Sequence, residues 1–431
     1  MQHLILYTLG VGLFLLLLIA SIALHELGHL YFAKKFGAEV TEYYVGFGKV
    51  VWKIRRGKTD YGMRLIPLGG YVRILGMFPP PQGELPAKGM KRSIYLAKQE
   101  SNAELSDDLK AFYRLPPWKK FVVMAAGPTV NILVAFFVLL GVFGIVGEQS
   151  IAAKPGAPVV ATVGLCAPTP ADPTGDCVNN DIKSPATLAG LEVGDQVVSF
   201  NGTKLKDWET LSQLIQNTTS GTLELKVIRD GKPLTLTTAA MKYEIPDPQT
   251  STSVDVGYLG ISPQVAIVSH RHGPLFTAKW MATKVDDVFV GLSALPKKVE
   301  NVLMAVLGIE KRDPEGPVSV VGGSRFAGAA MATDVPEIPV SSKLSYILLL
   351  TAAFNMFLGI ANAIPIPPLD GGHMAGAIWE SLRNKWASLR GKTLPGPFDS
   401  SKLLPLGYIG ALIIFAMGII LIVGDFVVPI K

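Results

Sequence analysis

Two histidines and a glutamate stand at the end of the first apolar run of the chain. Residues 4–24 carry no charge, and His25-Glu26-Leu27-Gly28-His29 follows them directly. On a helix, the H-E-x-x-H spacing places His25 and His29 one turn apart on one face, as a zinc ion requires, with a carboxylate beside them. Ionisable side chains at the end of a membrane-spanning segment are costly and therefore indicate function. The chemistry we expect is hydrolysis by a metal-activated water.

A third ligand is needed, because a catalytic zinc site uses three protein ligands and leaves one position open for water. The segment from Asn362 to His373 reads N-A-I-P-I-P-P-L-D-G-G-H, and its prolines must break the third apolar run. Asp370 would be an uncompensated carboxylate at membrane depth, and joining it to the two histidines explains its presence there. Two alternatives are that Asp370 caps a short helix and that His373 is the ligand; we prefer Asp370.

Glu26 is then the expected proton carrier. Zinc lowers the pKa of a bound water to about 7. Glu26 would accept the proton as that water attacks a carbonyl and would pass it to the leaving amine. The amide of Asn362 is a candidate for steadying the oxyanion or the substrate backbone.

The composition predicts a membrane protein. Of the 431 residues, 49% are hydrophobic and 17% are charged. Residues 4–24, 121–146, 344–367 and 403–429 form runs of the length that a helix needs to cross a bilayer. The first run lacks a basic flank and a small-residue cleavage site, so it is not a removed signal peptide. We expect a polytopic α-helical membrane protein with four transmembrane helices, a membrane-associated β-hairpin and an extracytoplasmic α+β domain.

The charges predict the orientation. Residues 32–120 hold 17 basic against 8 acidic side chains, and residues 371–402 hold 5 against 2, whereas residues 147–343 hold 17 against 21. The positive-inside rule places the two basic loops in the cytoplasm and the middle segment, with both chain ends, outside. Membrane orientation explains the net charge of +6, so no nucleic-acid partner is expected.

The first cytoplasmic region, residues 37–120, contains a hairpin candidate. Residues 63–76 are apolar around Gly69-Gly70, which would form the turn. The hairpin either dips into the membrane beside the active site or is an ordinary cytoplasmic hairpin. Residues 79–115 are expected to form a flexible loop with one amphipathic stretch. In the second span, residues 121–147, Asn131 either hydrogen-bonds across helices near the site or sits at a helix interface.

The outer segment begins with a small mixed domain over residues 159–245. The pattern S-P-A-x-x-A-G-L-x-x-G-D-x-V-x-x-x-N-G starts at Ser184, and a hairpin is expected around Asp230-Gly231. The segment resembles a PDZ domain, which holds peptides by strand addition. Residues 246–342 are amphipathic, and residues 273–308 are expected to form a helix at the outer membrane face or against that domain. Cys166 and Cys177 can form a disulfide in an oxidising compartment.

The pairing of H-E-x-x-H with N-x-x-P-x-P-x-L-D-G-G in a polytopic chain resembles the site-2 protease family of zinc intramembrane metalloproteases. The likeness extends to residues 67–72 and to the PDZ-like insert, and it covers nearly the whole chain. We expect residues 1–36 to hold the first transmembrane helix with H-E-x-x-H, residues 343–402 the third transmembrane helix with L-D-G and a cytoplasmic loop, and residues 403–431 the fourth transmembrane helix. The chain is most similar to the RseP-like branch that cleaves anti-sigma factors, and its single PDZ-like copy resembles the actinobacterial members.

The resemblance implies a zinc-dependent intramembrane endopeptidase in the cytoplasmic membrane of a bacterium. Its substrates would be single-span proteins such as anti-sigma factors, or signal-peptide remnants, trimmed first by a site-1-type protease. The PDZ-like domain would exclude intact proteins by size or bind the new end. The substrate would contact Gly69, Gly70, Tyr71, Asn362, Pro365 and Pro367. A metal transporter predicts internal repeats, which the sequence lacks, and a non-catalytic adaptor would not need Glu26.

Overall fold

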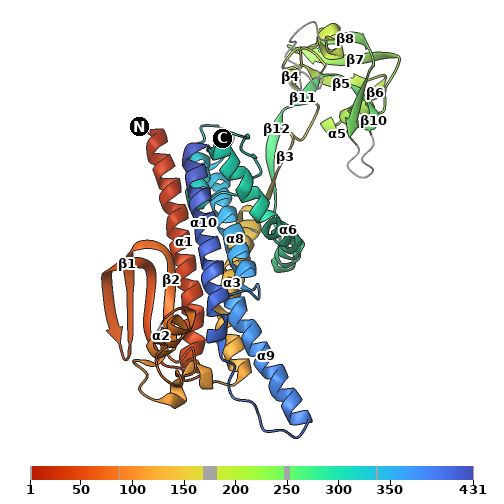
Figure 1. Ribbon diagram of the computed structural model, residues 1–431. Helices are drawn as coiled ribbons and strands as arrows, with labels where there is room; N and C mark the ends of the chain where they lie inside the picture. Colours follow the sequence, from red (N-terminus) through yellow and green to blue (C-terminus); the bar gives the residue numbers. More distant parts are fainter. Residues whose placement is uncertain (1, 87, 168–181, 247–252, 336–337, 431) are drawn as a thin grey trace. The chain divides into compact units, whose positions relative to one another are not determined.

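The computed structural model describes residues 2–86, 88–167, 182–246, 253–335 and 338–430. The chain forms two compact units, coloured by sequence in Figure 1. The first unit combines Met1–Glu148 with His270–Lys431, and the second is Gln149–Ser269. Every residue of the candidate metal site falls in the first unit.

Four described helices of the first unit are long and apolar enough to cross a membrane, which confirms the four predicted apolar spans. The helix α1 runs to Lys35 and therefore includes the H-E-x-x-H motif. The third span ends at Asn362 rather than at residue 367, because the prolines that follow cannot continue a helix. The helices are α1 (Gln2–Lys35), α3 (Pro117–Gly141) with its π-helical extension η3 (Val142–Val146), α8 (Val340–Asn362), and η4 (Ser400–Leu403) leading into α10 (Leu404–Val427).

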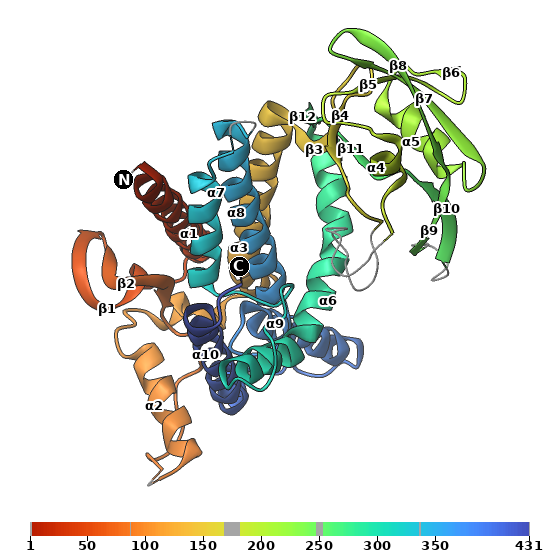
Figure 2. The same cartoon turned by 90° about the horizontal axis from the view of Figure 1, so that it is seen from above.

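The helices α6 (Pro274–Val306) and α7 (Val320–Ala332) also pack on these spans. The helix α6 contacts α3, α8 and α10, and α7 lies between α1 and α8, as Figure 2 shows end-on. The sequence did not reveal α7. Its small residues allow close approach: a Cβ on Gly328 would lie 2.8 Å from the ring of Tyr7.

The structure has a β-hairpin in this region, but it is not the hairpin predicted over residues 63–76. The strands β1 (Val40–Arg56) and β2 (Thr59–Ile74) are joined by Gly57-Lys58, and Gly69-Gly70 lies inside β2. Residues 42–45 pair with residues 70–73 on one side and with residues 60–63 on the other, so the hairpin curls back on itself. Gly69 has a φ of 97°, which a residue with a side chain rarely adopts. Residues 60–63 and 70–73 run in opposite directions on the two sides of residues 42–45, so Gly69 lies where the chain reverses, but the two arms do not pair with each other.

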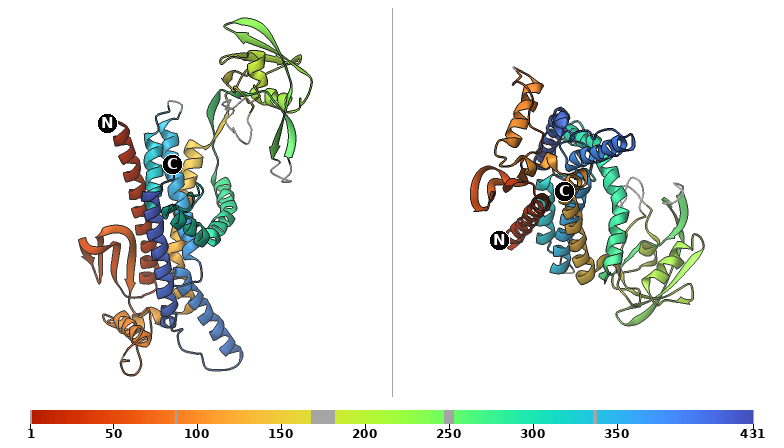
Figure 3. Two further views of the ribbon diagram at one scale, coloured as in Figure 1. Left: turned by 45° about the horizontal axis from the view of Figure 1, so that its top comes forward. Right: turned by 90° about the horizontal axis from the view of Figure 1, so that it is seen from below.

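The loop expected to be flexible contains regular structure. It folds into α2 (Met90–Asn102) and two short 3-10 turns, η1 (Asp108–Lys110) and η2 (Phe112–Arg114). Phe112 joins a core with Leu30 of α1 and Val123 of α3. The helix α9 (Asp370–Leu389) starts at the third proposed ligand and packs against α3. Figure 3 shows the first unit from two further sides.

The second unit has its own hydrophobic core, in which Val160, Val197, Leu211 and Leu225 are fully buried. A four-stranded sheet has the order β6-β5-β7-β8, and the predicted Asp230-Gly231 turn joins β7 to β8. The remaining strands pair as β11-β4, β10-β9 and β12-β3. The elements are β3 (Glu148–Ala153), β4 (Val160–Val163), α4 (Pro185–Ala189), β5 (Gln196–Phe200), β6 (Thr203–Lys204), α5 (Trp208–Gln216), β7 (Thr222–Arg229), β8 (Lys232–Ala239), β9 (Met241–Pro246), β10 (Ser253–Tyr258), β11 (Ile261–Pro263) and β12 (Val265–His270).

Candidate metal centre

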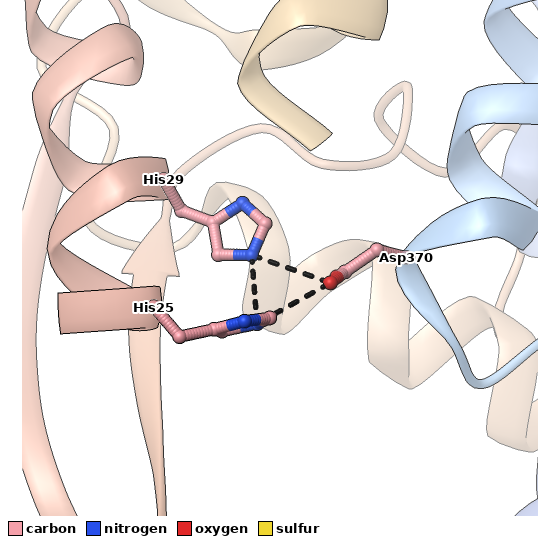
Figure 4. A group of neighbouring side chains, drawn as sticks. All are labelled: His25, His29 and Asp370. Carbon is pink, nitrogen blue, oxygen red and sulfur yellow. Dashed lines mark hydrogen bonds and ion pairs between the residues drawn. The ribbon is translucent and has the colours of Figure 1, made fainter. Parts of the chain in front are cut away.

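The three predicted ligands meet at one point, although one of them is more than 330 residues from the others. The Nε2 atoms of His25 and His29 lie 3.2 Å apart, and each lies 3.4 Å from Oδ2 of Asp370 (Figure 4). Ligand atoms of a tetrahedral zinc site with bonds of roughly 2.0–2.1 Å are about 3.3–3.4 Å apart. The triangle therefore has the size that a bound zinc ion requires.

The surroundings of the triangle fit a metal as well. Oδ2 of Asp370 is buried and has no hydrogen-bond donor among the described residues. Nδ1 of His29 donates to the backbone oxygen of Val123 at 2.8 Å, so its Nε2 is left as a lone-pair donor facing the other two ligands. Only 6% of His29 is exposed, which fixes its ring in this orientation.

A glycine on α3 makes the room for the two imidazoles. A Cβ on Gly127 would lie 2.2 Å from Nε2 of His29 and 2.7 Å from Nε2 of His25. No side chain other than hydrogen fits here without displacing the ligands. The sequence signal was the small-residue run Ala125-Ala126-Gly127, which indicates close packing but not what packs there.

Glu26 and β2 line the same cavity as the triangle. The cavity is about 560 Å³ in volume, and its lining includes His25, Glu26, His29, Asp370 and residues 70–74 of β2. A Cβ on Gly70 would lie 2.9 Å from Cγ of Glu26, so the strand backbone passes directly beside that side chain. Residues 70–73 pair on one side only, and no described strand occupies the other side. The site thus combines a triangle that could hold a metal ion, a carboxylate and a free strand edge.

An ionic network holds that strand edge in place. The hydroxyl of Tyr71 donates to the carboxylate of Glu42 and accepts from the guanidinium of Arg64. Arg73 donates to Glu42 at 3.3 Å and to Glu104 at 2.9 Å. Burial and the hydrogen bond to Glu42 together raise the pKa of Tyr71 to about 12, so the hydroxyl stays protonated and remains a donor.

The other predicted site residues are placed as follows. Asn362 ends α8, Pro365 lines a separate apolar cavity, and Pro367 contacts Gly407 and Gly410 of α10. His373 lies one turn into α9 and lines the cavity of the triangle without joining it. Cys166 is buried and is not a free thiol, whereas Cys177 lies outside the described residues. The substrate-binding roles and the disulfide stay predictions.

Comparison with known proteins supports the predicted resemblance. The model of peptidase family M50 matches residues 13–395. The chain is 30% identical to zinc metalloprotease Rip1 of Mycobacterium tuberculosis over 99% of both chains, and 28% identical to zinc metalloprotease Rip1 of Mycolicibacterium smegmatis over 99% of both. It is 26% identical to the regulator of sigma-E protease RseP of Escherichia coli over 86% of this chain and 90% of that protein. The resemblance stated from the motifs, including its actinobacterial branch, is confirmed.

Proposed function

This chain belongs to peptidase family M50 and is a membrane metalloendopeptidase, and from that premise we propose how its residues cut a membrane-embedded peptide. The observation that carries the proposal is the His25–His29–Asp370 triangle in one cavity with Glu26 and the free edge of β2. His25, His29 and Asp370 hold zinc, which when bound activates a water molecule and polarises the scissile carbonyl.

Glu26 is the proton carrier. It lies between the two histidine ligands in sequence and lines their cavity. From there its carboxylate accepts a proton from the attacking water and delivers it to the nitrogen of the leaving amine. The backbone of Gly70 beside Glu26 places an extended substrate within reach of this carboxylate.

The strand edge at residues 70–73 binds the substrate backbone. A peptide bond inside a transmembrane helix is hydrogen-bonded and shielded, so the helix must be extended before a water molecule can attack it. Pairing with the free edge of β2 replaces the lost helical hydrogen bonds in a place where bulk water cannot do so. We assign Gly69, Gly70 and Tyr71 to this contact. We also assign Asn362, Pro365 and Pro367 to substrate contact, although they lie beside the break after α8 and outside the cavity that holds the triangle.

The site lies at the cytoplasmic end of the spans. The two basic loops, residues 32–120 and 371–402, meet through the Lys98–Asp399 ion pair at 2.5 Å and the Lys120–Glu380 ion pair at 2.8 Å. They therefore lie at one end of the helices, as the positive-inside rule requires of two cytoplasmic loops. The second unit is then extracytoplasmic and PDZ-like, with Cys166 and Cys177 joined in the oxidising compartment.

The substrates we propose are single-span membrane proteins, such as anti-sigma factors already trimmed by another protease, and signal-peptide remnants. The second unit discriminates against intact proteins, either by size or by binding the newly cut end. Cleavage of such a segment in the bacterial cytoplasmic membrane completes a regulated two-step proteolysis.

The test is zinc-dependent cleavage of a single-span, type II-oriented substrate in liposomes. Wild type should cleave within the span. Glu26→Gln should be inactive and still contain zinc, whereas Asp370→Ala should lose both activity and zinc. Glu84→Gln, which changes an exposed carboxylate outside the site, should behave like wild type. Cleavage that survives in Glu26→Gln would contradict the proposed role of this residue.

A further inference from the structure

The helix α9 has one face that is fixed to the rest of the protein. Glu380 pairs with Lys120 of α3 at 2.8 Å and accepts from the backbone nitrogen of Phe398 at 3.1 Å. Arg383 donates to the backbone oxygen of Gly396, and the ring of Phe398 lies against Gly376. The residues 376, 380 and 383 follow helical spacing, so α3 and residues 396–398 cover this one face.

A second face of α9, centred about 120° around the helix from the first, is apolar and uncovered. At 100° per residue, its five large side chains fall within an arc of about 100°. No described element covers them, although two are tryptophans. An exposed apolar face of this size marks an interaction site. The residues and their exposed fractions are Ile378 (49%), Trp379 (57%), Leu382 (56%), Trp386 (62%) and Leu389 (74%).

Positive charge surrounds this face. Residues 381–402 contain five basic side chains and one acidic one, Asp399, which is paired with Lys98. The guanidinium of Arg390 lies 4.1 Å from the ring centre of Trp386. Tryptophan next to arginine and lysine is the composition of a helix that lies in the headgroup region of an anionic membrane.

The chain connectivity holds α9 close to the bilayer. It begins eight residues after the third span ends at Asn362, and the loop that follows it returns to the fourth span at Leu404. A second copy of the chain would bring the same basic flank against itself and be repelled, whereas anionic headgroups complement that flank.

We propose that α9 lies on the anionic surface of the membrane, with Trp379, Leu382 and Trp386 inserted among the headgroups. This inference goes beyond the proteolytic function, because it assigns a lipid-binding surface outside the catalytic cavity. Since α9 begins with Asp370, the membrane surface then fixes the direction of the helix that supplies this residue.

The experiment measures thiol labelling of the full-length protein in lipid nanodiscs that hold one copy each. Leu382→Cys places a thiol on the apolar face, and Ser388→Cys places a matched, exposed thiol about 120° around the same helix. Wild type reports the background from the native cysteines. In discs of phosphatidylglycerol, a membrane-impermeant thiol reagent should label Leu382→Cys roughly tenfold more slowly than Ser388→Cys.

The role of charge is tested in the same discs. Replacing Lys385, Arg390 and Lys392 with glutamine, or using phosphatidylcholine discs, should return the labelling rate of Leu382→Cys towards that of Ser388→Cys. Equal labelling of the two thiols in phosphatidylglycerol would overturn the proposal. Shielding seen only in discs that hold two copies would assign the face to a dimer and would also overturn it. Neither result depends on whether the protein cleaves any substrate.

Discussion

At the scale of single residues, the candidate metal centre needs a glycine at position 127 as well as its three proposed ligands. Gly127 lets α3 pass within contact of both imidazoles. We predict that Gly127→Ala displaces His29 or His25 and lowers zinc affinity by roughly tenfold or more, as changes next to a metal ligand commonly do. Bound zinc after dialysis against a graded chelator measures the effect.

The matched control is Gly141→Ala in the same helix, where an added Cβ meets nothing within 4 Å. It should retain zinc and thermal stability like wild type. Equal zinc binding by Gly127→Ala and Gly141→Ala would mean that the imidazoles do not need the space seen beside α3.

The sequence predicted the chemically distinctive residues and missed the steric ones. His25, Glu26 and His29 have a recognisable spacing, and Asp370 stands out as a carboxylate after an apolar run. Gly127 is one glycine among 44, and the acceptor at Val123 is a backbone oxygen that any residue would supply. Contacts of this kind arise from helix packing across long sequence separations, and spacing along the chain does not encode them.

At the scale of elements, the buried Lys120–Glu380 pair joins α3 to the helix that begins with Asp370. Both side chains are only 7% exposed. Lys120→Met leaves the Glu380 carboxylate buried without its cation, which should cost about 3–5 kcal/mol in the free energy of unfolding. The double variant Lys120→Met/Glu380→Met should recover most of this loss, because no uncompensated charge remains.

Denaturant unfolding of these two variants and of the single variant Glu380→Met in detergent measures this coupling. Zinc content of the same samples reports whether α9 still presents Asp370. If the losses in unfolding free energy of the two single variants add up in the double variant, the ion pair does not join the helices.

Elements marked by a long apolar run or by a characteristic turn sequence could be predicted. Elements that depend on the segments packed against them could not. The four apolar spans and the Asp230-Gly231 turn are present, although the third span ends at Asn362 before the prolines that were included in its predicted run. Gly69-Gly70 resembled the turn of a hairpin, but residues 42–45 lie between the two arms, and Gly70 allows the close approach of β2 to Glu26. The helix α7 was missed because its Gly- and Ala-rich sequence has little apolar pattern and is stabilised by packing on α1 and α8.

At the scale of the whole molecule, the second unit should have its own acid sensitivity. Asp195 is fully buried, and its pKa is lowered: burial alone would raise it, but the hydrogen-bonded Arg229 and the backbone nitrogen of Glu192 outweigh that effect. The stabilisation is complete above the unfolded-state pKa of about 3.9 and is lost as the pH falls through the lower folded-state pKa.

Thermal unfolding of a fragment spanning Gln149–Ser269 between pH 7 and pH 2.5 measures this dependence. The midpoint should fall steeply below about pH 4. Asp195→Asn should be less stable than wild type at pH 7 and should lose part of the acid dependence. An unchanged pH profile in Asp195→Asn would assign the acid sensitivity to other carboxylates.

The division into two units also predicts that cleavage and discrimination can be separated. His25, Glu26, His29, Asp370 and the cavity around them all belong to the first unit. Glu148 and His272 contact each other at 3.1 Å, so a short linker can replace residues 149–269 without stretching the first unit. This deletion should keep zinc content and cleave a substrate with a minimal outer segment at a rate within about threefold of wild type.

Rates for matched substrates with short and long outer segments then distinguish the two roles proposed for the second unit. A size filter predicts that the deletion releases cleavage of the long substrate, because the barrier is gone. Recognition of a newly cut end predicts slower cleavage of the trimmed substrate, because a binding contact is gone. Loss of zinc on deletion would instead show that the second unit supports the metal centre itself.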